Sequence, residues 1–282
     1  MAVTACAIAL TALRPHLRHT LTGDIRFHRR FHSHFLASDR DVIVYLPPGY
    51  RRLRTRRYPV LYMHDGQNLF DGATSFVPGK DWQVDETAER LIKDGDVEPL
   101  IIVGIYNTGV DRVDEYTPTR DESRNAGGKA DLYGRMIVEE LKPFIDSRYR
   151  TLGDREHTGL GGSSLGGLVT LYLGLKYTDV FGKLAVVSPA AWWDNRAITR
   201  QVRSLVAKPA TRIWLDIGTE EGRNGEPVKE VELLKDALIE KGWIAGVDFN
   251  YVVAEGAVHD EAAWAARVEP ILRFLFPGTK KP

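Results

Sequence analysis

Apolar runs and helically spaced apolar positions alternate along most of the chain. The continuous apolar runs at 58–63 and 100–105 are typical of strands that are buried on both faces of a sheet. Further strands are expected at 157–161, 184–187, 212–217 and 249–254, and helices at 82–93, 132–146, 165–177, 227–241 and 261–274. Strands that alternate with helices in this way predict an α/β fold, in which helices cover both faces of a mostly parallel sheet.

The beginning of the pattern differs, because two strands come before any helix. Residues 25–35 and 41–46 alternate or cluster apolar positions like two antiparallel strands, and Pro47-Pro48-Gly49-Tyr50 ends the second. We expect both at the N-terminal edge of the sheet. No internal repeat or low-complexity linker divides the rest, so residues 21–282 are predicted to form one domain, preceded by a poorly ordered or surface-packed segment at 1–20.

One stretch inside the predicted domain has no periodicity. Residues 106–130 are rich in Asp, Arg, Thr and Gly, and we expect them to form a long loop. A loop of this length inside a compact domain is usually functional or mobile. Whether this loop acts as a lid stays open at this point.

Charge and cysteine content narrow the function classes. Lys+Arg and Asp+Glu both number 38, so nothing indicates nucleic acid or an anionic membrane as a partner. Cys6 is the single cysteine, which excludes an intrachain disulfide and suits a reducing compartment. The apolar run at 2–13 has no positive residue before it and no clear cleavage site after it, so it is not a convincing signal peptide. We expect a cytoplasmic protein.

The candidate chemistry begins at Gly162-Ser163-Ser164-Leu165-Gly166, which fits G-x-S-x-G. In this pattern a strand turns sharply into a helix, and the central serine stands at the tip of the turn as a nucleophile. The flanking glycines allow a close approach that a Cβ would prevent. The pattern alone is common, but a predicted strand precedes it and a predicted helix follows. Ser164 is therefore the expected nucleophile.

A serine hydroxyl needs a general base, and in this fold the chain order is serine, acid, histidine. His259 follows the last predicted strand and precedes the last predicted helix. The other seven of the eight histidines all precede Ser164. Order alone therefore leaves His259 as the candidate base.

The acid that orients the histidine is expected after the strand at 212–217. The loop there reads Gly218-Thr219-Glu220-Glu221-Gly222. Glu220 and Glu221 are neighbours, and the residues alone do not choose between them. Asp216 lies inside the predicted strand and is less well placed.

Two backbone N–H groups should stabilise the oxyanion of a tetrahedral intermediate. One is the N–H of Leu165, directly after the nucleophile. The other should come from the loop after the strand at 58–63, where Gln67 is the first choice and Gly66 the second. His64 and Asp65 stand in the same loop, and we interpret them as residues that shape it.

Three tryptophans are candidates for a substrate pocket. Trp192 and Trp193 follow the end of a predicted strand, at the edge of the sheet where the catalytic residues are expected, and Trp82 is a similar candidate. Plain core packing explains all three tryptophans equally well. The histidines His28, His32 and His34 alternate along a strand beside arginines, which favours a strand over a metal site. No metal, nucleotide or flavin motif is present, so we expect no cofactor.

Several segments together resemble the putative esterase family of α/β-hydrolases, which includes esterase D, feruloyl and acetylxylan esterases, enterochelin esterases and mycolyl transferases. The similarity covers roughly residues 25–277 and depends on the segments 44–50, 59–66, 161–167 and 218–221, and on His259-Asp260 with Trp264. The resemblance implies the α/β-hydrolase fold, with Ser164 as nucleophile and His259 as base. The family often has Gly-Thr-x-acid, which favours Glu221, although feruloyl esterases commonly have Asp there. The resemblance also supports Gln67 as oxyanion donor, and the tryptophan pair is similar to one in enterochelin esterases.

These observations predict a serine carboxylic-ester hydrolase that acts through an acyl-enzyme on small short-chain or aryl esters of the acetyl or feruloyl type. A siderophore esterase is the nearest alternative and would need cationic groups such as Arg112, Arg120 and Arg124 around its pocket. An acyltransferase would use the same three residues. A catalytically silent binding protein of this fold is the non-enzyme alternative, and the intact order of serine, acid and histidine argues against it.

Overall fold

The computed structural model describes residues 18–222 and 224–279. The segment expected at 1–20 therefore lies outside the described residues except for its last three positions. Two of these hold the chain against a later loop. His19 Nδ1 lies 2.6 Å from a carboxylate oxygen of Asp71, and the Thr20 hydroxyl donates a 2.9 Å hydrogen bond to Asp81.

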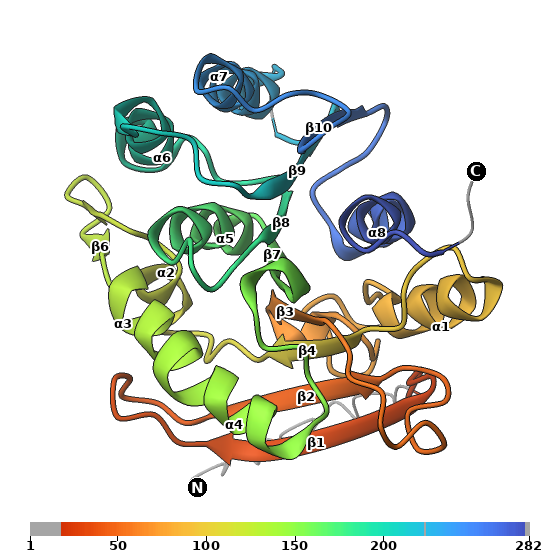
Figure 1. The fold of residues 1–282 in the computed structure, drawn as a ribbon. Helices are drawn as coiled ribbons and strands as arrows, with labels where there is room; N and C mark the ends of the chain where they lie inside the picture. Colours follow the sequence, from red (N-terminus) through yellow and green to blue (C-terminus); the bar gives the residue numbers. More distant parts are fainter. Residues whose placement is uncertain (1–17, 223, 280–282) are drawn as a thin grey trace, which may run out of the picture.

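The fold is built on an eight-stranded sheet (Figure 1). In spatial order its strands are β1 (Asp24–Phe31), β2 (Arg40–Leu46), β4 (Ile101–Ile105), β3 (Val60–His64), β7 (Thr158–Ser163), β8 (Lys183–Val187), β9 (Arg212–Gly218) and β10 (Phe249–Ala254). The pairs β1–β2 and β2–β4 are antiparallel, and every later pair is parallel. The predicted fold class, a mostly parallel sheet with antiparallel N-terminal edge strands, is confirmed.

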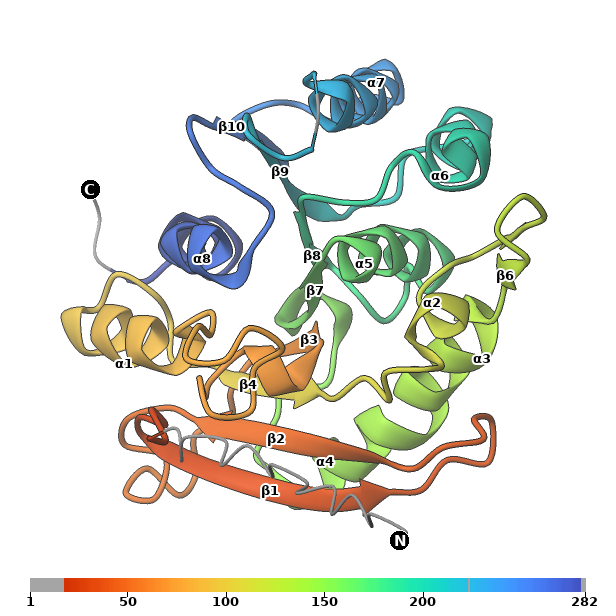
Figure 2. The ribbon, with the colours of Figure 1, turned by 180° about the vertical axis from the view of Figure 1, so that it is seen from behind.

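Helices cover both faces of the sheet, as both ribbon views show (Figures 1 and 2). One face carries α1 (Val84–Asp94) and α8 (Glu261–Leu275). The other carries α3 (Ala130–Arg135), a π-helical turn (Met136–Leu141), α4 (Lys142–Arg148), α5 (Leu165–Lys176), α6 (Trp193–Ser204) and α7 (Glu226–Glu240). Because successive strand residues point to opposite faces, β2 supplies Val42 and Val44 to one core, and Ile43 and Tyr45 to the other.

The expectation of an aperiodic loop over 106–130 is corrected by the structure. The stretch contains a short helix, α2 (Arg112–Glu115), and a two-stranded hairpin of β5 (Arg120–Asp121) and β6 (Ala126–Gly127). Local side-chain bonds hold it, for example the 2.7 Å bond from the Gly127 N–H to Asp114. Such bonds leave no periodic trace in a sequence, which is why the pattern of apolar positions does not reveal these elements.

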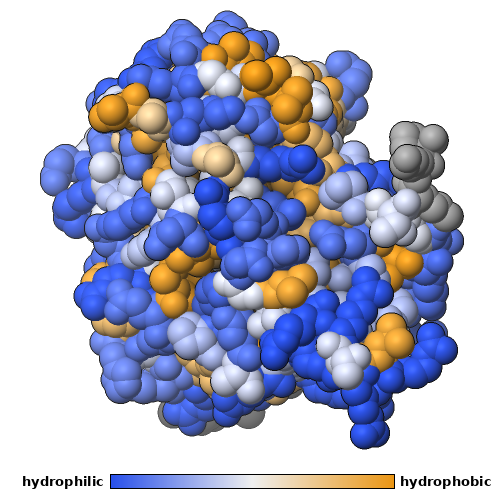
Figure 3. Space-filling view, viewed as in Figure 1, coloured by the Kyte–Doolittle hydropathy of each residue, from blue (hydrophilic) through white to orange (hydrophobic). Residues whose placement is uncertain are grey.

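The face of the molecule seen in Figure 3 is mostly hydrophilic, with small separate apolar areas. Most apolar side chains of the central strands are instead buried in the two cores. Within the described ranges, no helix is both long enough and apolar enough to cross a bilayer.

Candidate active site

Three residues singled out from the sequence come together at one edge of the sheet. Ser164 follows β7 directly, Glu221 follows β9, and His259 follows β10. The carboxyl ends of parallel strands share an edge, which is where ligand sites of open α/β sheets form. Ser164 and His259 line the same two cavities, and Glu221 lines one of them.

Ser164 stands at a strained turn between β7 and α5. Its backbone has φ 60° and ψ −122°, and its N–H donates a 3.1 Å bond to the Val187 carbonyl. Positive φ at a non-glycine residue costs on the order of 1–3 kcal/mol and is characteristic of functional sites. The glycines around the turn allow close packing: a Cβ on Gly162 would lie 3.2 Å from the Gly166 carbonyl carbon and 3.0 Å from the His64 ring.

Of the three candidate acids, Glu221 is the one that contacts His259. Its Oε2 lies 2.7 Å from His259 Nδ1. Glu220 is exposed, whereas Asp216 is buried in β9 and bonded to other groups. The ring of Trp264 meets His259 edge-on at a centroid distance of 4.9 Å. The imidazole is therefore held from two sides.

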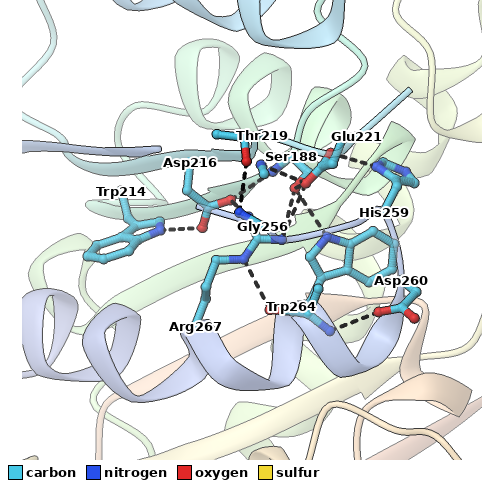
Figure 4. A network of polar contacts seen from close by, with 12 residues as sticks. Ser188, Trp214, Asp216, Thr219, Glu221, Gly256, His259, Asp260, Trp264 and Arg267 are labelled. Carbon is cyan, nitrogen blue, oxygen red and sulfur yellow. Dashed lines mark hydrogen bonds and ion pairs between the residues drawn. The ribbon is translucent and has the colours of Figure 1, made fainter. Parts of the chain in front are cut away.

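The other carboxylate oxygen of Glu221 is held by a buried network (Figure 4). Its Oε1 accepts bonds from the Ser188 hydroxyl at 2.5 Å and the Gly218 N–H at 2.8 Å, and Arg267 Nη2 lies 3.4 Å away. Burial alone would raise the pKa of Glu221, but hydrogen bonds from His259 and Ser188 lower that pKa below its usual value. The carboxylate is thus ionised at neutral pH and fixed in orientation.

Arg267 is a part of this network that sequence reasoning missed. Its side chain rises from α8 between two carboxylates and is almost fully buried (Figure 4). Nη1 donates a 2.9 Å bond to Asp216 Oδ1, and Nη2 donates a 3.1 Å bond to the Ser188 hydroxyl. Burial raises the pKa of Asp216 to about 6 in spite of this cation. The only sequence feature that points to Arg267 is its spacing from Trp264, which stands one helical turn earlier. The Trp264 indole also donates a 3.1 Å bond to the Ser188 hydroxyl.

We expect Arg267→Met to lower the free energy of unfolding by about 3–5 kcal/mol, because it leaves two buried carboxylates without their cation. Urea unfolding followed by circular dichroism measures the change. Arg273→Met is the matched control, since Arg273 lies on the same helix and pairs with Glu269 at the surface. That change should lower the free energy of unfolding far less, because exposed ion pairs contribute little. Equal losses in the two variants would contradict the prediction.

Two cavities meet at Ser164 and His259. The first, of about 350 Å³, is also lined by Gln67, Phe76 and Trp264. The second, of about 280 Å³, is lined by apolar and small residues, among them Pro189, Ala190, Trp192, Ile217 and Pro227. An ester has an acyl side and an alcohol side, and two cavities at one serine can hold one each.

The structure separates the three tryptophans expected near the substrate. Trp192 lines the second cavity and is 40% exposed. Trp193 and Trp82 are buried and line neither cavity, so their assignment to the pocket is corrected. The Trp193 indole donates to the Thr119 carbonyl at 3.0 Å, and Trp82 packs on Trp264 at a centroid distance of 5.5 Å. Both positions are those of core residues.

The two expected oxyanion donors lie in the first turns of helical segments at this edge. Leu165 is the first residue of α5, and Gln67 lies in a 3₁₀ turn (Gly66–Asn68). The first N–H groups of a helix have no acceptor within it. The turn is fixed on both sides of Gln67, since its side-chain oxygen accepts from Asn107 N at 3.2 Å and its carbonyl accepts from the Thr74 hydroxyl at 2.7 Å. Gln67 also lines the first cavity.

His64 and Asp65 directly precede this turn, and Asp65 also lines the first cavity. Asp65, in the left-handed region, is held by two 2.8 Å bonds from Arg112. His64 is buried, and its Nδ1 lies 2.8 Å from the Tyr133 hydroxyl. Burial lowers the pKa of His64 to about 3, although the charge of Asp65 acts in the opposite direction. His64 is therefore neutral in the folded protein.

Because His64 is buried in its neutral form, the folded protein should be less stable at acidic pH. Between pH 6.5 and about 3 the unfolded chain binds a proton at His64 that the folded chain does not. The free energy of unfolding should therefore fall as the pH falls through this window, by up to about 1.4 kcal/mol per pH unit. His64→Phe should remove this part of the slope in urea unfolding at several pH values. His157→Gln, at a partly exposed histidine, should keep the wild-type dependence of the free energy of unfolding on pH. The same dependence in His64→Phe and wild type would contradict its attribution to His64.

The arginines considered for an anionic substrate all have partners. Arg112 lines the first cavity but is bound by Asp65. Arg124 lies 3.3 Å from Asp121 and over the Trp192 ring, and Arg120 contacts Glu122 at 3.5 Å. Among the described residues, no group of three His, Cys, Asp or Glu side chains is arranged to hold a metal ion.

Comparisons with known proteins agree with this architecture. Residues 33–275 match the model of the family described as putative esterase. The chain is 29% identical over 255 residues to the uncharacterized protein YbbA of Bacillus subtilis (strain 168). The alignment covers 86% of this chain and 95% of that protein. It is 28% identical over 240 residues to an endo-1,4-beta-xylanase/feruloyl esterase of Xylanibacter ruminicola, covering 83% of this chain and 29% of that protein.

Among solved structures, an IroE-like serine hydrolase from Shewanella oneidensis is similar, with a TM-score of 0.72 and 23% identity. The match covers 90% of this chain and 80% of that one, which confirms the fold. The family match spans most of the chain. The chain belongs to the putative esterase family and is a carboxylic ester hydrolase with the α/β-hydrolase fold.

Proposed function

We propose that this hydrolase works through a serine-bound acyl-enzyme, with Ser164 as nucleophile, His259 as general base and Glu221 as the acid that orients His259. The observation that carries the proposal is the 2.7 Å contact of His259 Nδ1 with a buried, ionised Glu221, at a histidine that shares two cavities with Ser164. Glu221 fixes the tautomer that leaves Nε2 free to accept a proton.

In the first half of the reaction, His259 takes the proton of Ser164 as Oγ attacks the ester carbonyl. The N–H groups of Leu165 and Gln67 stabilise the oxyanion. The imidazolium then protonates the leaving alcohol as the C–O bond breaks. In the second half, His259 takes a proton from water as the water attacks the acyl-enzyme. It then gives that proton to Ser164 Oγ as the acyl–Oγ bond breaks and the acid leaves. The His259 side chain is 43% exposed, which gives that water access and supports hydrolysis over acyl transfer.

The cavities support small short-chain or aryl esters as substrates. Phe76 and Trp264 line the first cavity, and Trp192 and Ile217 line the second, so each offers apolar surface to an acyl or aryl group. The similarity to a xylanase/feruloyl esterase favours acetyl or feruloyl-type esters within that class.

The proposed triad acid, Glu221, is a glutamate. Its side chain is longer than that of aspartate and reaches His259 from the turn after β9.

The test combines active-site labelling with turnover. A fluorophosphonate probe should label Ser164, identified by mass spectrometry of the modified peptide. The protein should hydrolyse p-nitrophenyl esters from acetate to laurate with a preference for short chains, or methyl ferulate. A protein that is folded by circular dichroism but neither labels nor hydrolyses any ester would overturn the serine mechanism.

A further inference from the structure

Glu261 is a buried carboxylate at the catalytic cavity that the proposed mechanism does not use. It is the first residue of α8, stands two positions after His259 and lines the first cavity. Its side chain is 4% exposed, and Oε1 accepts a 3.3 Å bond from Asn68 Nδ2. The Phe76 N–H donates to Asn68 Oδ1 at 2.9 Å, which fixes the amide so that its nitrogen faces Glu261.

The charges around this cavity are mostly neutralised, and Glu261 is the exception. Arg112 and Asp65 form a two-bond ion pair. Asp260 caps α8 and lies 3.2 Å from Lys80. Within the described part of the chain, no Lys or Arg forms an ion pair with Glu261. Burial without a cation raises the pKa of Glu261, in agreement with this geometry.

An anionic group in this cavity would therefore be placed near an uncompensated carboxylate in a poorly solvated space, where like charges repel strongly. A hydroxyl or amide group would instead gain a charge-assisted hydrogen bond, which is stronger than a neutral one. Arg112 does not offset the repulsion, because Asp65 already occupies its guanidinium.

On the basis of the proposed serine esterase function, we propose that Glu261 is a specificity-determining residue that selects uncharged esters carrying a hydrogen-bond donor and disfavours anionic esters. The substrate class thus consists of neutral esters with a hydroxyl or amide near the ester bond. Carboxylated or phosphorylated esters are excluded from efficient turnover.

Two matched ester pairs test this, one for each side of the ester bond. On the alcohol side, 4-acetoxybenzamide is compared with 4-acetoxybenzoate. On the acyl side, methyl 4-carbamoylbenzoate is compared with monomethyl terephthalate. In each pair an amide replaces a carboxylate of similar shape. At pH 8 we expect wild-type kcat/KM to favour the neutral ester by about tenfold or more in at least one pair, since about 1.4 kcal/mol of repulsion gives that factor.

Glu261→Gln, which keeps the size and the contact with Asn68, should narrow this ratio to within about threefold by raising kcat/KM for the anionic ester. Glu220→Gln, an exposed residue that lines neither cavity, should keep the wild-type ratio. Wild-type turnover that is equal within both pairs would overturn the proposal. So would a Glu261→Gln variant that slows both esters equally, since the residue would then only position Asn68.

Protection of Ser164 from fluorophosphonate labelling by each ester gives the same comparison where turnover is slow, and it requires no variant. Protection by the neutral esters at lower concentrations than the anionic ones is the expected result, and equal protection would contradict it. Failure of the proposed function is seen separately, as a folded protein whose Ser164 does not label at all.

Discussion

Ser164→Ala is expected to lower kcat/KM for p-nitrophenyl acetate by roughly 10⁴-fold or more. Without Oγ no acyl-enzyme forms, and only the oxyanion donors and the cavities continue to act on the substrate. The substitution removes one oxygen from a half-buried side chain and leaves the backbone of the turn in place, so the free energy of unfolding should change little. Initial rates of both proteins with equal circular dichroism spectra provide the measurement.

Ser163→Ala is the informative neighbour for this experiment. Ser163 ends β7 beside Ser164, and the two serines stand together in the motif. The Ser163→Ala protein should still label with a fluorophosphonate, whereas Ser164→Ala should not. If Ser163→Ala lost labelling and Ser164→Ala kept it, the nucleophile would be Ser163 and the proposal would be wrong.

Glu221→Gln is expected to reduce kcat by roughly 10⁴-fold, the size of effect seen when an amide replaces the acid of such a triad. The contacts dictate which way the amide points. Ser188, Gly218 and Arg267 all donate towards the Oε1 position, so the amide oxygen must lie there. The amide nitrogen then faces His259 Nδ1, which forces the proton onto Nε2 and removes the base.

Glu220→Gln is the matched control, because the same change is made one residue earlier on an exposed side chain. Its kcat should stay within about twofold of wild type, in the range of ordinary surface substitutions. Steady-state kinetics of the two variants side by side decide between the neighbours. If the Glu220 variant lost activity and the Glu221 variant kept it, the proposed acid would be wrong.

Much of the fold and of the candidate site follows from the sequence, for identifiable reasons. Buried parallel strands read as continuous apolar runs, so β3 and β4 were predicted nearly to their ends. The order of the motifs along the chain singled out Ser164 and His259. Both conclusions depend on local pattern or on chain order, which a sequence displays directly.

Other features depend on directions in space. The residues alone left Glu220 and Glu221 open, because neighbours in a turn point to opposite sides and only the fold says which side faces His259. For the same reason Trp192 and Trp193 could not be separated. The helix α6 was not predicted, and its first turn departs from helical geometry, with positive φ from Asp194 to Arg196.

The network around Arg267 illustrates a third kind of limit. Its partners come from two neighbouring strands and the turns after them: Ser188 follows β8, Asp216 lies in β9, and Glu221 lies in the turn after β9. A single sequence shows an arginine on an amphipathic helix, for which a solvated position is the ordinary expectation. Only the docking of α8 against the sheet converts that arginine into a buried cation.

The position of α8 also has a consequence for the protein during its synthesis. The nucleophile and its turn emerge from the ribosome long before His259, Trp264 and Arg267, which lie on or beside the last helix. That helix closes against α1, from the first third of the chain, where Arg90 meets Glu269 at 2.5 Å. Domains generally fold as units. A nascent chain should therefore remain inert towards esters and acquire activity only when translation has passed Arg267 and α8 can pack against the sheet.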